Sequence, residues 1–387
     1  MKILTIDIGT GTQDIFLYNS KLNVENGYKL ILPSPTLIIS NKIRLATQKH
    51  LPILLTGKTM GGGPSSWAVE GHIKAGLHVY ATPPAAKTIH DDLDQVSASG
   101  VTIISEEEAN ALPDSVLRME LKDFDLDAIA SVFADFGVDL GDLAAVAVAV
   151  FDHGEAPHGV SDRKFRFDYL NSCIRTRNDL RTFAYLPEQI PTAMTRLQAV
   201  ADSAKQLDVP LIVMDTAPAA VLGATFDPKV CNHGQKLIVN IGNFHTLAFR
   251  MNGPQIDGIF EHHTGFLTRD KLETLLLALA NGSLQNESVF TDQGHGALIY
   301  DQFPFTYQTE EFNLIVTGPR RGMLDPTQVE ILPRFTPHFA APFGDMMITG
   351  CFGLLAAVAD RVPRLADEIT SSLIGNSKYA VAPWDVT

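Results

Sequence analysis

The 387-residue chain has 45% hydrophobic and 19% charged residues, and its formal net charge is −14. This composition is typical of a folded globular protein and excludes an intrinsically disordered one. The acidic balance, without a run of Lys or Arg, argues against a general binder of nucleic acid or of anionic membranes. At this length we expect about two domains.

The three cysteines, Cys173, Cys231 and Cys351, are far apart in the sequence. They provide neither a disulfide framework nor a C-x-x-C metal site, and they suit a reducing compartment. The N-terminus does not read as a signal peptide, and the longest apolar run, residues 143–151, is too short to cross a membrane. We therefore expect a soluble, cytoplasmic protein that uses neither a membrane nor a nucleic acid.

The chain opens with a strand pattern over residues 2–6 that ends at Asp7. The turn that follows is Gly9-Thr10-Gly11-Thr12. Glycines let the backbone approach an anion closely, successive free N–H groups form an anion-binding nest, and threonine hydroxyls add donors. Asp7 is placed to hold a divalent cation against phosphate oxygens. The segment predicts a nucleotide phosphate site, and a plain β-hairpin is the structural alternative.

Two better-known phosphate motifs each fail at a required residue. The dinucleotide fingerprint G-x-G-x-x-G needs glycine where Asp14 stands. A Walker A loop ending in Gly57-Lys58-Thr59 would need its first glycine where Pro52 stands. The opening turn therefore belongs to another class of phosphate site.

Strand and helix patterns then alternate, which predicts an α/β fold. The polar and aromatic stretch 155–191 reads as an insertion over a cleft, and residues 160–186 as a surface for a protein partner. After residue 236, three strands follow one another over short connections. We expect strands at 15–18, 30–39 (broken at Pro33–Pro35), 53–56, 78–81, 101–104, 143–151, 210–214, 236–241, 246–251, 255–261 and 312–316, and helices at 65–75, 89–98, 125–136, 192–207, 267–280 and 346–360.

The order of these pieces resembles the actin-like ATPase superfamily, which includes sugar kinases, acetate kinases and heat-shock chaperone ATPases. Its first phosphate loop, Asp-x-Gly-Thr-x-Thr, matches residues 7–12 at every defined position. Its connecting, adenosine and closing segments resemble residues 213–224, 314–322 and 348–357. The resemblance implies two ribonuclease-H-like domains around a cleft, divided as 1–190 (first domain with an insertion), 191–235 (connecting helix region), 236–345 (second domain) and 346–387 (closing helix and tail).

The family's second phosphate loop, Asp-x-Gly-x-x-Thr, resembles the segment from Asn240 to Thr246. The resemblance implies that ATP and Mg²⁺ bind between the domains, with Asp7 at the metal. It also implies that Asp215 positions or deprotonates a nucleophile, although a helix N-cap explains that residue equally well. The residues it assigns to the nucleotide are Gly9, Thr10, Gly11, Thr12, Asn240, Gly242, Asn243, Thr246, Gly318 and Arg320.

Asn240 replaces the carboxylate of the family's second loop, which removes a charge that would bind magnesium. Phosphoryl transfer is then expected to be slow, or another carboxylate, such as Asp14 or Asp152, contacts the metal. Three functions stay open: an ATPase or phosphotransferase, a nucleotide-gated regulator or activation factor with little turnover, and a metal-dependent hydrolase. The third would use the histidines at predicted strand ends and loops, which are His153, His158, His245, His262, His263 and His338.

Within the superfamily, the chain looks closest to a prokaryotic family labelled "putative pyruvate formate-lyase activating enzyme". A radical-SAM iron–sulfur site needs three closely clustered cysteines. The separated cysteines of this chain argue against that chemistry.

Overall fold

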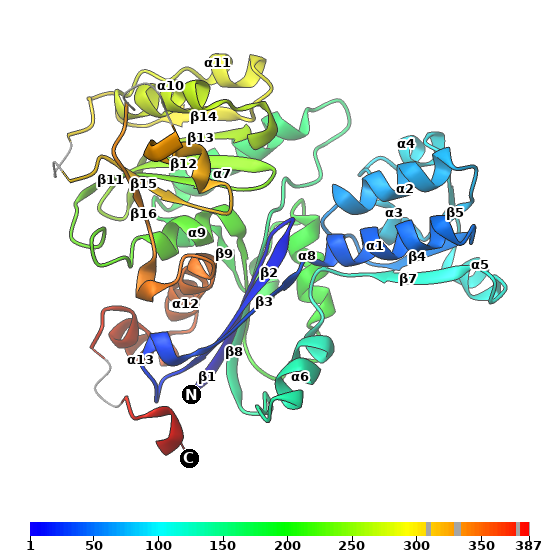
Figure 1. The fold of residues 1–387 in the computed structure, drawn as a ribbon. Coiled ribbons are helices and arrows are strands. Elements are labelled where there is room, and N and C mark those ends of the chain that lie inside the picture. The colour runs from blue at the N-terminus through cyan, green and yellow to red at the C-terminus, as the bar shows by residue number, and fades with distance from the viewer. Residues whose placement is uncertain (307–310, 329–333, 377–379, 387) are drawn as a thin grey trace.

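A computed structural model describes residues 1–306, 311–328, 334–376 and 380–386. Two six-stranded sheets and one four-stranded sheet organise these residues. In Figure 1 the first six-stranded sheet runs through the centre, the second lies at the upper left, and the four-stranded sheet lies at the right. The functional site is built where these three regions meet.

The first sheet has the strand order β3-β2-β1-β8-β10-β9. β1, β2 and β3 are antiparallel, whereas β8 and β10 run parallel to β1. The all-apolar β8 is buried on both faces, because its alanines and valines alternate between two separate hydrophobic clusters. The strands are β1 (Lys2–Ile8), β2 (Thr12–Asn19), β3 (Tyr28–Pro33), β8 (Leu143–Val150), β9 (Ala184–Tyr185) and β10 (Leu211–Asp215).

The second sheet repeats this arrangement in the order β14-β13-β12-β11-β15-β16. β11, β12 and β13 are antiparallel, and β15 and β16 continue the sheet in parallel. The edge strand β9 of the first sheet and the edge strand β14 of the second are additions. If the other five strands of each sheet are numbered along the chain, both sheets have the order 3-2-1-4-5. This repeated topology confirms two ribonuclease-H-like domains of the actin-like ATPase fold. The strands are β11 (Gln235–Ile241), β12 (His245–Asn252), β13 (Gln255–His263), β14 (Gly296–Ile299), β15 (Leu314–Thr317) and β16 (Pro337–Phe339).

The four-stranded sheet is inserted between β3 and β8 and is entirely parallel, in the order β6-β5-β4-β7. It has its own apolar core, built around Leu55 and Val79. The stretch predicted to be an insertion over a cleft contains the helix α7 (Asp162–Thr176), which buries Phe167 and Leu170 in the apolar cluster shared by the two six-stranded sheets, with Phe167 against Gly296 of β14. The strands are β4 (Ile53–Gly57), β5 (Val79–Ala81), β6 (Val101–Ile103) and β7 (Leu117–Leu121).

The strand predicted over residues 30–39 is wrong beyond Pro33, because α1 (Pro35–Gln48) begins there. The hydroxyl of Ser34 accepts a hydrogen bond from the Leu37 N–H, and proline occupies the first helical position. Ser before Pro is a helix-start signal, so it outweighed the β-branched residues that suggested a strand.

Two central helices, α9 (Thr216–Ala224) and α12 (Thr349–Arg361), pack between the two six-stranded sheets. They cross at glycines: a Cβ on Gly223 would lie 1.8 Å from the Thr349 carbonyl oxygen, and one on Gly353 would lie 1.9 Å from that of Ala219. Because α9 contacts strands of both sheets and α12 packs on the first sheet, their crossing helps to fix how the two domains meet.

The remaining α-helices are α2 (Pro64–Lys74), α3 (Pro83–Ala86), α4 (Leu93–Ala98), α5 (Glu106–Ala111), α6 (Leu126–Asp135), α8 (Thr195–Ser203), α10 (Arg269–Ala280), α11 (Asn286–Thr291) and α13 (Pro363–Leu373). α6 and α8 pack on the first sheet, α10 on the second, α1 and α2 on the four-stranded sheet, and α13 against α12 (Figure 1). In the described residues, no helix combines the length and apolarity needed to cross a bilayer.

Candidate functional site

The two domains carry hairpin turns with the same backbone geometry. In the β1–β2 turn, the Gly9 N–H donates to the Thr12 carbonyl over 2.9 Å, and in the β11–β12 turn the Gly242 N–H donates to the His245 carbonyl over 2.9 Å. The strand registers align Asp7 with Asp14 and Asn240 with Leu247. His245 therefore occupies the position in the second turn that Thr12 occupies in the first. The sequence pattern assigns this position to Thr246, one residue later.

These turns face each other across a cavity of about 600 Å³. A Cβ on Gly11 would lie 2.9 Å from the Asn243 amide nitrogen, so the two turns are in contact at their tips. Nine of the residues predicted for the site line this cavity, namely Asp7, Gly9, Thr10, Gly11, Thr12, Asn240, Gly242, Asn243 and Gly318. The structure thus brings together segments that are more than 200 residues apart in the chain.

Asp7 and Asp14 form a pair of carboxylates at the base of the first turn. They are register partners on adjacent antiparallel strands, so their side chains lie on the same face of the sheet. Burial raises the pKa of Asp7 to about 7, and the neighbouring charge of Asp14 adds to the shift. Burial likewise raises the pKa of Asp14 to about 7. The Thr216 hydroxyl donates to Asp7 Oδ1 over 2.5 Å, whereas Asp14 Oδ1 is buried without a hydrogen-bond partner.

This pair fits a hard divalent cation. An unpartnered buried carboxylate oxygen is costly, and a cation that binds two carboxylates relieves both their repulsion and their desolvation. The second turn has no such pair, because an amide (Asn240) and an apolar residue (Leu247) stand at the equivalent positions. Carboxylate ligands for a cation are therefore concentrated in the first turn.

We expect the Asp14→Asn variant to melt about 3 °C higher than the wild type at pH 8 without metal, a shift that corresponds to roughly 2–3 kcal/mol in a protein of this size. A carboxylate with a raised folded-state pKa lowers stability as the pH rises from its ordinary value of 3.8 through about 7. The difference should therefore shrink at pH 5, where Asp14 is protonated in the wild-type fold. Thermal melts at both pH values measure it. Asp114→Asn, at an exposed position, is the control, and an equal or lower melting temperature for Asp14→Asn at pH 8 would contradict the explanation.

Asp215 lies outside the cavity lining. Its carboxylate caps α9 by accepting from the Ala217 N–H over 3.2 Å, and it forms a fully buried ion pair with Arg166 of α7. The Arg166 side chain also donates to Glu261 of β13 over 3.1 Å and to the Asp152 carbonyl over 2.8 Å. Burial raises the pKa of Asp215, partly offset by the Arg166 charge. In this arrangement Asp215 ties α9 to both domains.

Two further predicted residues also lie away from the cavity lining. The Thr246 hydroxyl is buried and hydrogen-bonded to that of Thr264 at 2.9 Å. Arg320 is exposed at the start of a short 3-10 helix that follows β15. Asp152, weighed as an alternative metal contact, does line the cavity, but its two carboxylate oxygens accept from the Gly154 and Leu197 N–H groups.

The segment inserted between β3 and β8 forms a third wall of the cavity, with residues between Thr59 and Trp67. A Cβ on Gly63 would lie 2.8 Å from the Phe244 ring, and the Trp67 and Phe244 rings pack edge to face at 5.4 Å. Two cationic side chains also line the cavity, each already paired: Arg196 with Asp123 at 2.6 Å, and Lys87 with Glu155 at 2.8 Å. The inserted segment therefore contacts the second phosphate turn directly.

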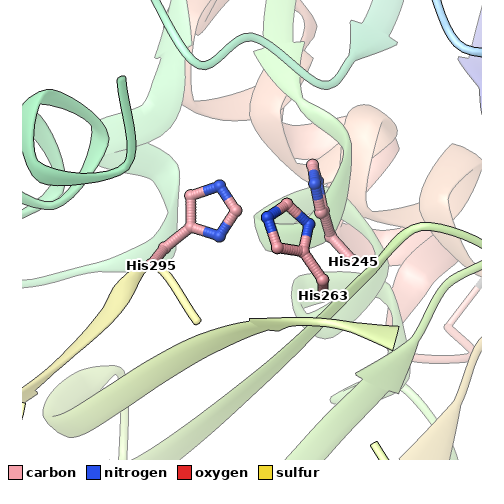
Figure 2. A group of neighbouring side chains, drawn as sticks. All are labelled: His245, His263 and His295. Atoms are coloured by element: carbon pink, nitrogen blue, oxygen red, sulfur yellow. The ribbon is translucent and has the colours of Figure 1, made fainter. Parts of the chain in front are cut away.

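His245, His263 and His295 converge beside the second turn (Figure 2). Their ring centroids lie 4.6–5.0 Å apart. Burial lowers the pKa of His295 to about 2 and also lowers the pKa values of His245 and His263, so all three rings are neutral at pH 7. Three other predicted histidines pair with separate acidic residues: His153 with Asp91, His262 with Asp292 and His338 with Asp227.

Comparison with known families identifies the chain. A family profile described as "Putative pyruvate format-lyase activating enzyme (DUF1786)" matches residues 60–323. The chain belongs to this family. The match includes the second phosphate turn and the three converging histidines, whereas the first turn precedes it. No curated protein matches the sequence significantly.

Solved structures similar to this family member share little sequence with it. A ROK hexokinase from Thermus thermophilus is 8% identical with a TM-score of 0.25, and the match covers 66% of this chain but only 47% of the hexokinase. The activator of 2-hydroxyisocaproyl-CoA dehydratase from Clostridium difficile, with bound ADPNP, is 9% identical with a TM-score of 0.34 over 95% of this chain and 98% of the activator. An Aquifex aeolicus Ppx/GppA protein is 9% identical with a TM-score of 0.31 over 97% and 89%. The fold assignment rests on the sheet topology rather than on these scores.

Sequence reasoning missed three residues of this family member's site: Arg166, Glu261 and His295. Arg166 lies among several other basic residues, and no local pattern marks it as the buried one. Glu261 reads as the end of a strand. His295 stands between Gly294 and Gly296 just before a short apolar strand. The flanking glycines were the one local sign of an unusual position. The role of His295 becomes clear only when β14 is seen to pair with β13.

Proposed function

We propose that the protein binds Mg-ATP in the cavity between its two domains and acts as an ATPase or phosphotransferase. The observation that carries the proposal is the pair of hairpin turns, closed by equivalent hydrogen bonds, that face each other across one cavity. Each turn offers backbone N–H groups, and the first adds two threonine hydroxyls. Such paired donors suit the oxygens of a polyphosphate, where catalysis consists mainly of positioning and charge stabilisation.

The wall formed by Thr317, Gly318 and Pro319 at the end of β15 would contact the adenosine part. The exposed Arg320 would reach only an outward-facing part of the nucleotide. Asp7 and Asp14 would hold Mg²⁺, which neutralises charge on phosphate oxygens. The phosphates would lie between Gly9–Thr12 and the Gly242–Asn243 segment.

Asp215 acts in this proposal as a positioning residue. Its carboxylate is occupied by Arg166 and by the α9 N-terminus, so it orients Thr216, whose hydroxyl donates to Asp7. A direct role as a base would require Arg166 to release it when the acceptor binds.

The second candidate is a nucleotide-gated regulator or activation factor with little turnover. The asymmetry between the turns favours it, because Asn240 and Leu247 leave the second turn without carboxylates for a metal. A protein partner contacting residues 160–186 belongs to this candidate. The two candidates differ in one observable: a phosphotransferase consumes ATP once its acceptor is present, whereas a regulator binds ATP with negligible turnover.

We expect domain closure on Mg-ATP to move the fluorescence emission of Trp67 to shorter wavelength. Trp67 and Phe244 belong to different walls of the cavity and their rings touch edge to face, but Trp67 is still 56% exposed, so a tighter closure would bury more of the indole. The Trp384→Phe variant leaves Trp67 as the only tryptophan. In the same background, Phe244→Ala should weaken the change at saturating nucleotide. Unchanged emission in a protein that binds Mg-ATP would show that the cleft does not close in this way.

Calorimetric titration of the purified protein with ATP, with and without magnesium, tests the proposal. It predicts saturable binding that strengthens when magnesium is present. Absence of heat or of saturation under both conditions would exclude nucleotide as the ligand of this cavity. Phosphate release measured on the same preparation then separates the two candidates.

A further inference from the structure

The second phosphate turn carries a histidine cluster that the proposed nucleotide function does not use. His245 begins β12, His263 ends β13, and His295 immediately precedes β14. β12, β13 and β14 are neighbours in the second sheet, and His245 and His263 are direct register partners. The His295 N–H donates to the Glu261 carbonyl over 2.9 Å, which fixes the third histidine beside the other two. The three rings thus project from the ends of three neighbouring strands of one sheet.

From each ring, one nitrogen lies within 4.8 Å of the corresponding nitrogens of the other two rings. Nitrogen ligands around one tetrahedral zinc ion are about 3.4 Å apart, since each Zn–N bond is about 2.1 Å. Side-chain rotations that bring the nitrogens together by up to about 1.4 Å would therefore complete a three-histidine site. Within the described residues, this is the one group of three or more His, Cys, Asp or Glu side chains with such spacing.

A second observation comes from the carboxylate behind the cluster. Glu261 is fully buried, and its Oε1 lies 3.7 Å from His245 Nδ1 and 3.6 Å from His295 Nδ1. Both Glu261 Oε1 and His295 Nδ1 are buried without a hydrogen-bond partner. Metal-binding histidines usually donate their other ring N–H to a carboxylate, which fixes the ring and leaves the opposite nitrogen for the metal. Glu261 occupies that supporting position for two of the three histidines.

We propose that His245, His263 and His295 bind one first-row transition-metal ion of the zinc class, with Glu261 orienting the rings. Three imidazoles without a thiolate suit Zn²⁺ and its neighbours in the first transition row and not Mg²⁺, which prefers oxygen ligands. The site is separate from the Asp7 and Asp14 pair and does not depend on nucleotide binding.

The metal would face the same cavity as the nucleotide. His245 and His263 line the cavity, whereas His295 is buried behind them. A site with three protein ligands keeps a position open for water or a substrate oxygen. Phe151, which also lines the cavity, packs on His245 with ring centroids 4.0 Å apart. An oxygen-bearing substrate bound beside the phosphates is the ligand class that this geometry accepts.

Zinc titration of the full chain, after removal of metals with a chelator, tests the site. We expect one equivalent to bind, and Co²⁺ in its place to give the intense visible absorption of a tetrahedral site. His263→Ala and His295→Ala should each weaken zinc binding by at least ~100-fold, and Glu261→Gln by about 10- to 100-fold. His158→Ala, which removes an exposed histidine outside the cluster, should leave the affinity unchanged.

Several controls make the outcome decisive. Excess Mg²⁺ should not displace zinc, and Asp7→Asn should keep full zinc affinity, so failure of the nucleotide proposal would not affect this one. If His295→Ala folds poorly by circular dichroism, the less buried His263→Ala decides. Absence of stoichiometric zinc binding, or undiminished affinity in His263→Ala, would overturn the site.

Discussion

The Asp7→Asn variant is expected to lose at least ~100-fold in magnesium-dependent ATP affinity while keeping its fold. Loss of a partner in the outer shell of a metal site already costs 10- to 100-fold, so removal of a direct carboxylate ligand should cost more. The substitution keeps the shape of the side chain and can still accept the Thr216 hydroxyl hydrogen bond. It also removes a buried charge, so the protein without metal should not be destabilised.

Calorimetry with and without magnesium separates this effect from a general loss of binding. The variant should retain any weak, magnesium-independent ATP binding through the two turns. Asp114→Asn removes one exposed carboxylate that does not line the cavity and should behave like the wild type. Full magnesium dependence in Asp7→Asn would show that the cation is held elsewhere.

The Gly353→Ala variant is expected to lose about 3 kcal/mol or more in free energy of unfolding, or to fail to fold. The added Cβ would lie 1.9 Å from the Ala219 carbonyl oxygen and 3.0 Å from the Gly223 nitrogen, both of which are backbone atoms. Neither can rotate away, so α9 and α12 would have to separate. Because these helices join the two domains, their separation would disrupt both the packing of the central apolar core and the arrangement of the domains.

A matched helix glycine provides the control for this prediction. Gly71 lies on the exposed side of α2, and a Cβ there would meet no atom within 4 Å. Gly71→Ala should raise stability by about 0.5–1 kcal/mol, since alanine is the better helix former. Chemical denaturation of both variants measures the contrast. Equal stabilities would mean that the helix crossing tolerates a wider separation than the fold indicates.

The two phosphate turns could be predicted from sequence to different extents. The first repeats a six-residue pattern at every defined position, and glycine and threonine there are local signals of an anion-binding turn. The second has lost its aspartate, so the alignment relied on the glycine at 242 and on the nearest threonine, Thr246. Strand register shows that His245 occupies the position of Thr12. A one-residue shift in a hairpin moves a side chain to the other face of the sheet, which is why Thr246 is buried.

The histidine cluster and the buried ion pairs could not be predicted in the same way. Residues 245 and 263 pair across a hairpin, but His295 joins them only through β14, which is separated from β13 by two helices. The partners of Arg166 come from β10 and β13, in different domains. Such contacts depend on how sheets and helices assemble, and they leave no periodic trace in the sequence around each residue.

The structure of the protein bound to a non-hydrolysable ATP analogue and magnesium tests the central claim most directly. We predict that the β- and γ-phosphates lie between Gly9–Thr12 and the Gly242–Asn243 segment, with magnesium on Asp7 and Asp14 and the base against the Thr317–Pro319 wall. Phosphates bound away from both turns, or a metal that contacts neither carboxylate, would contradict the claim.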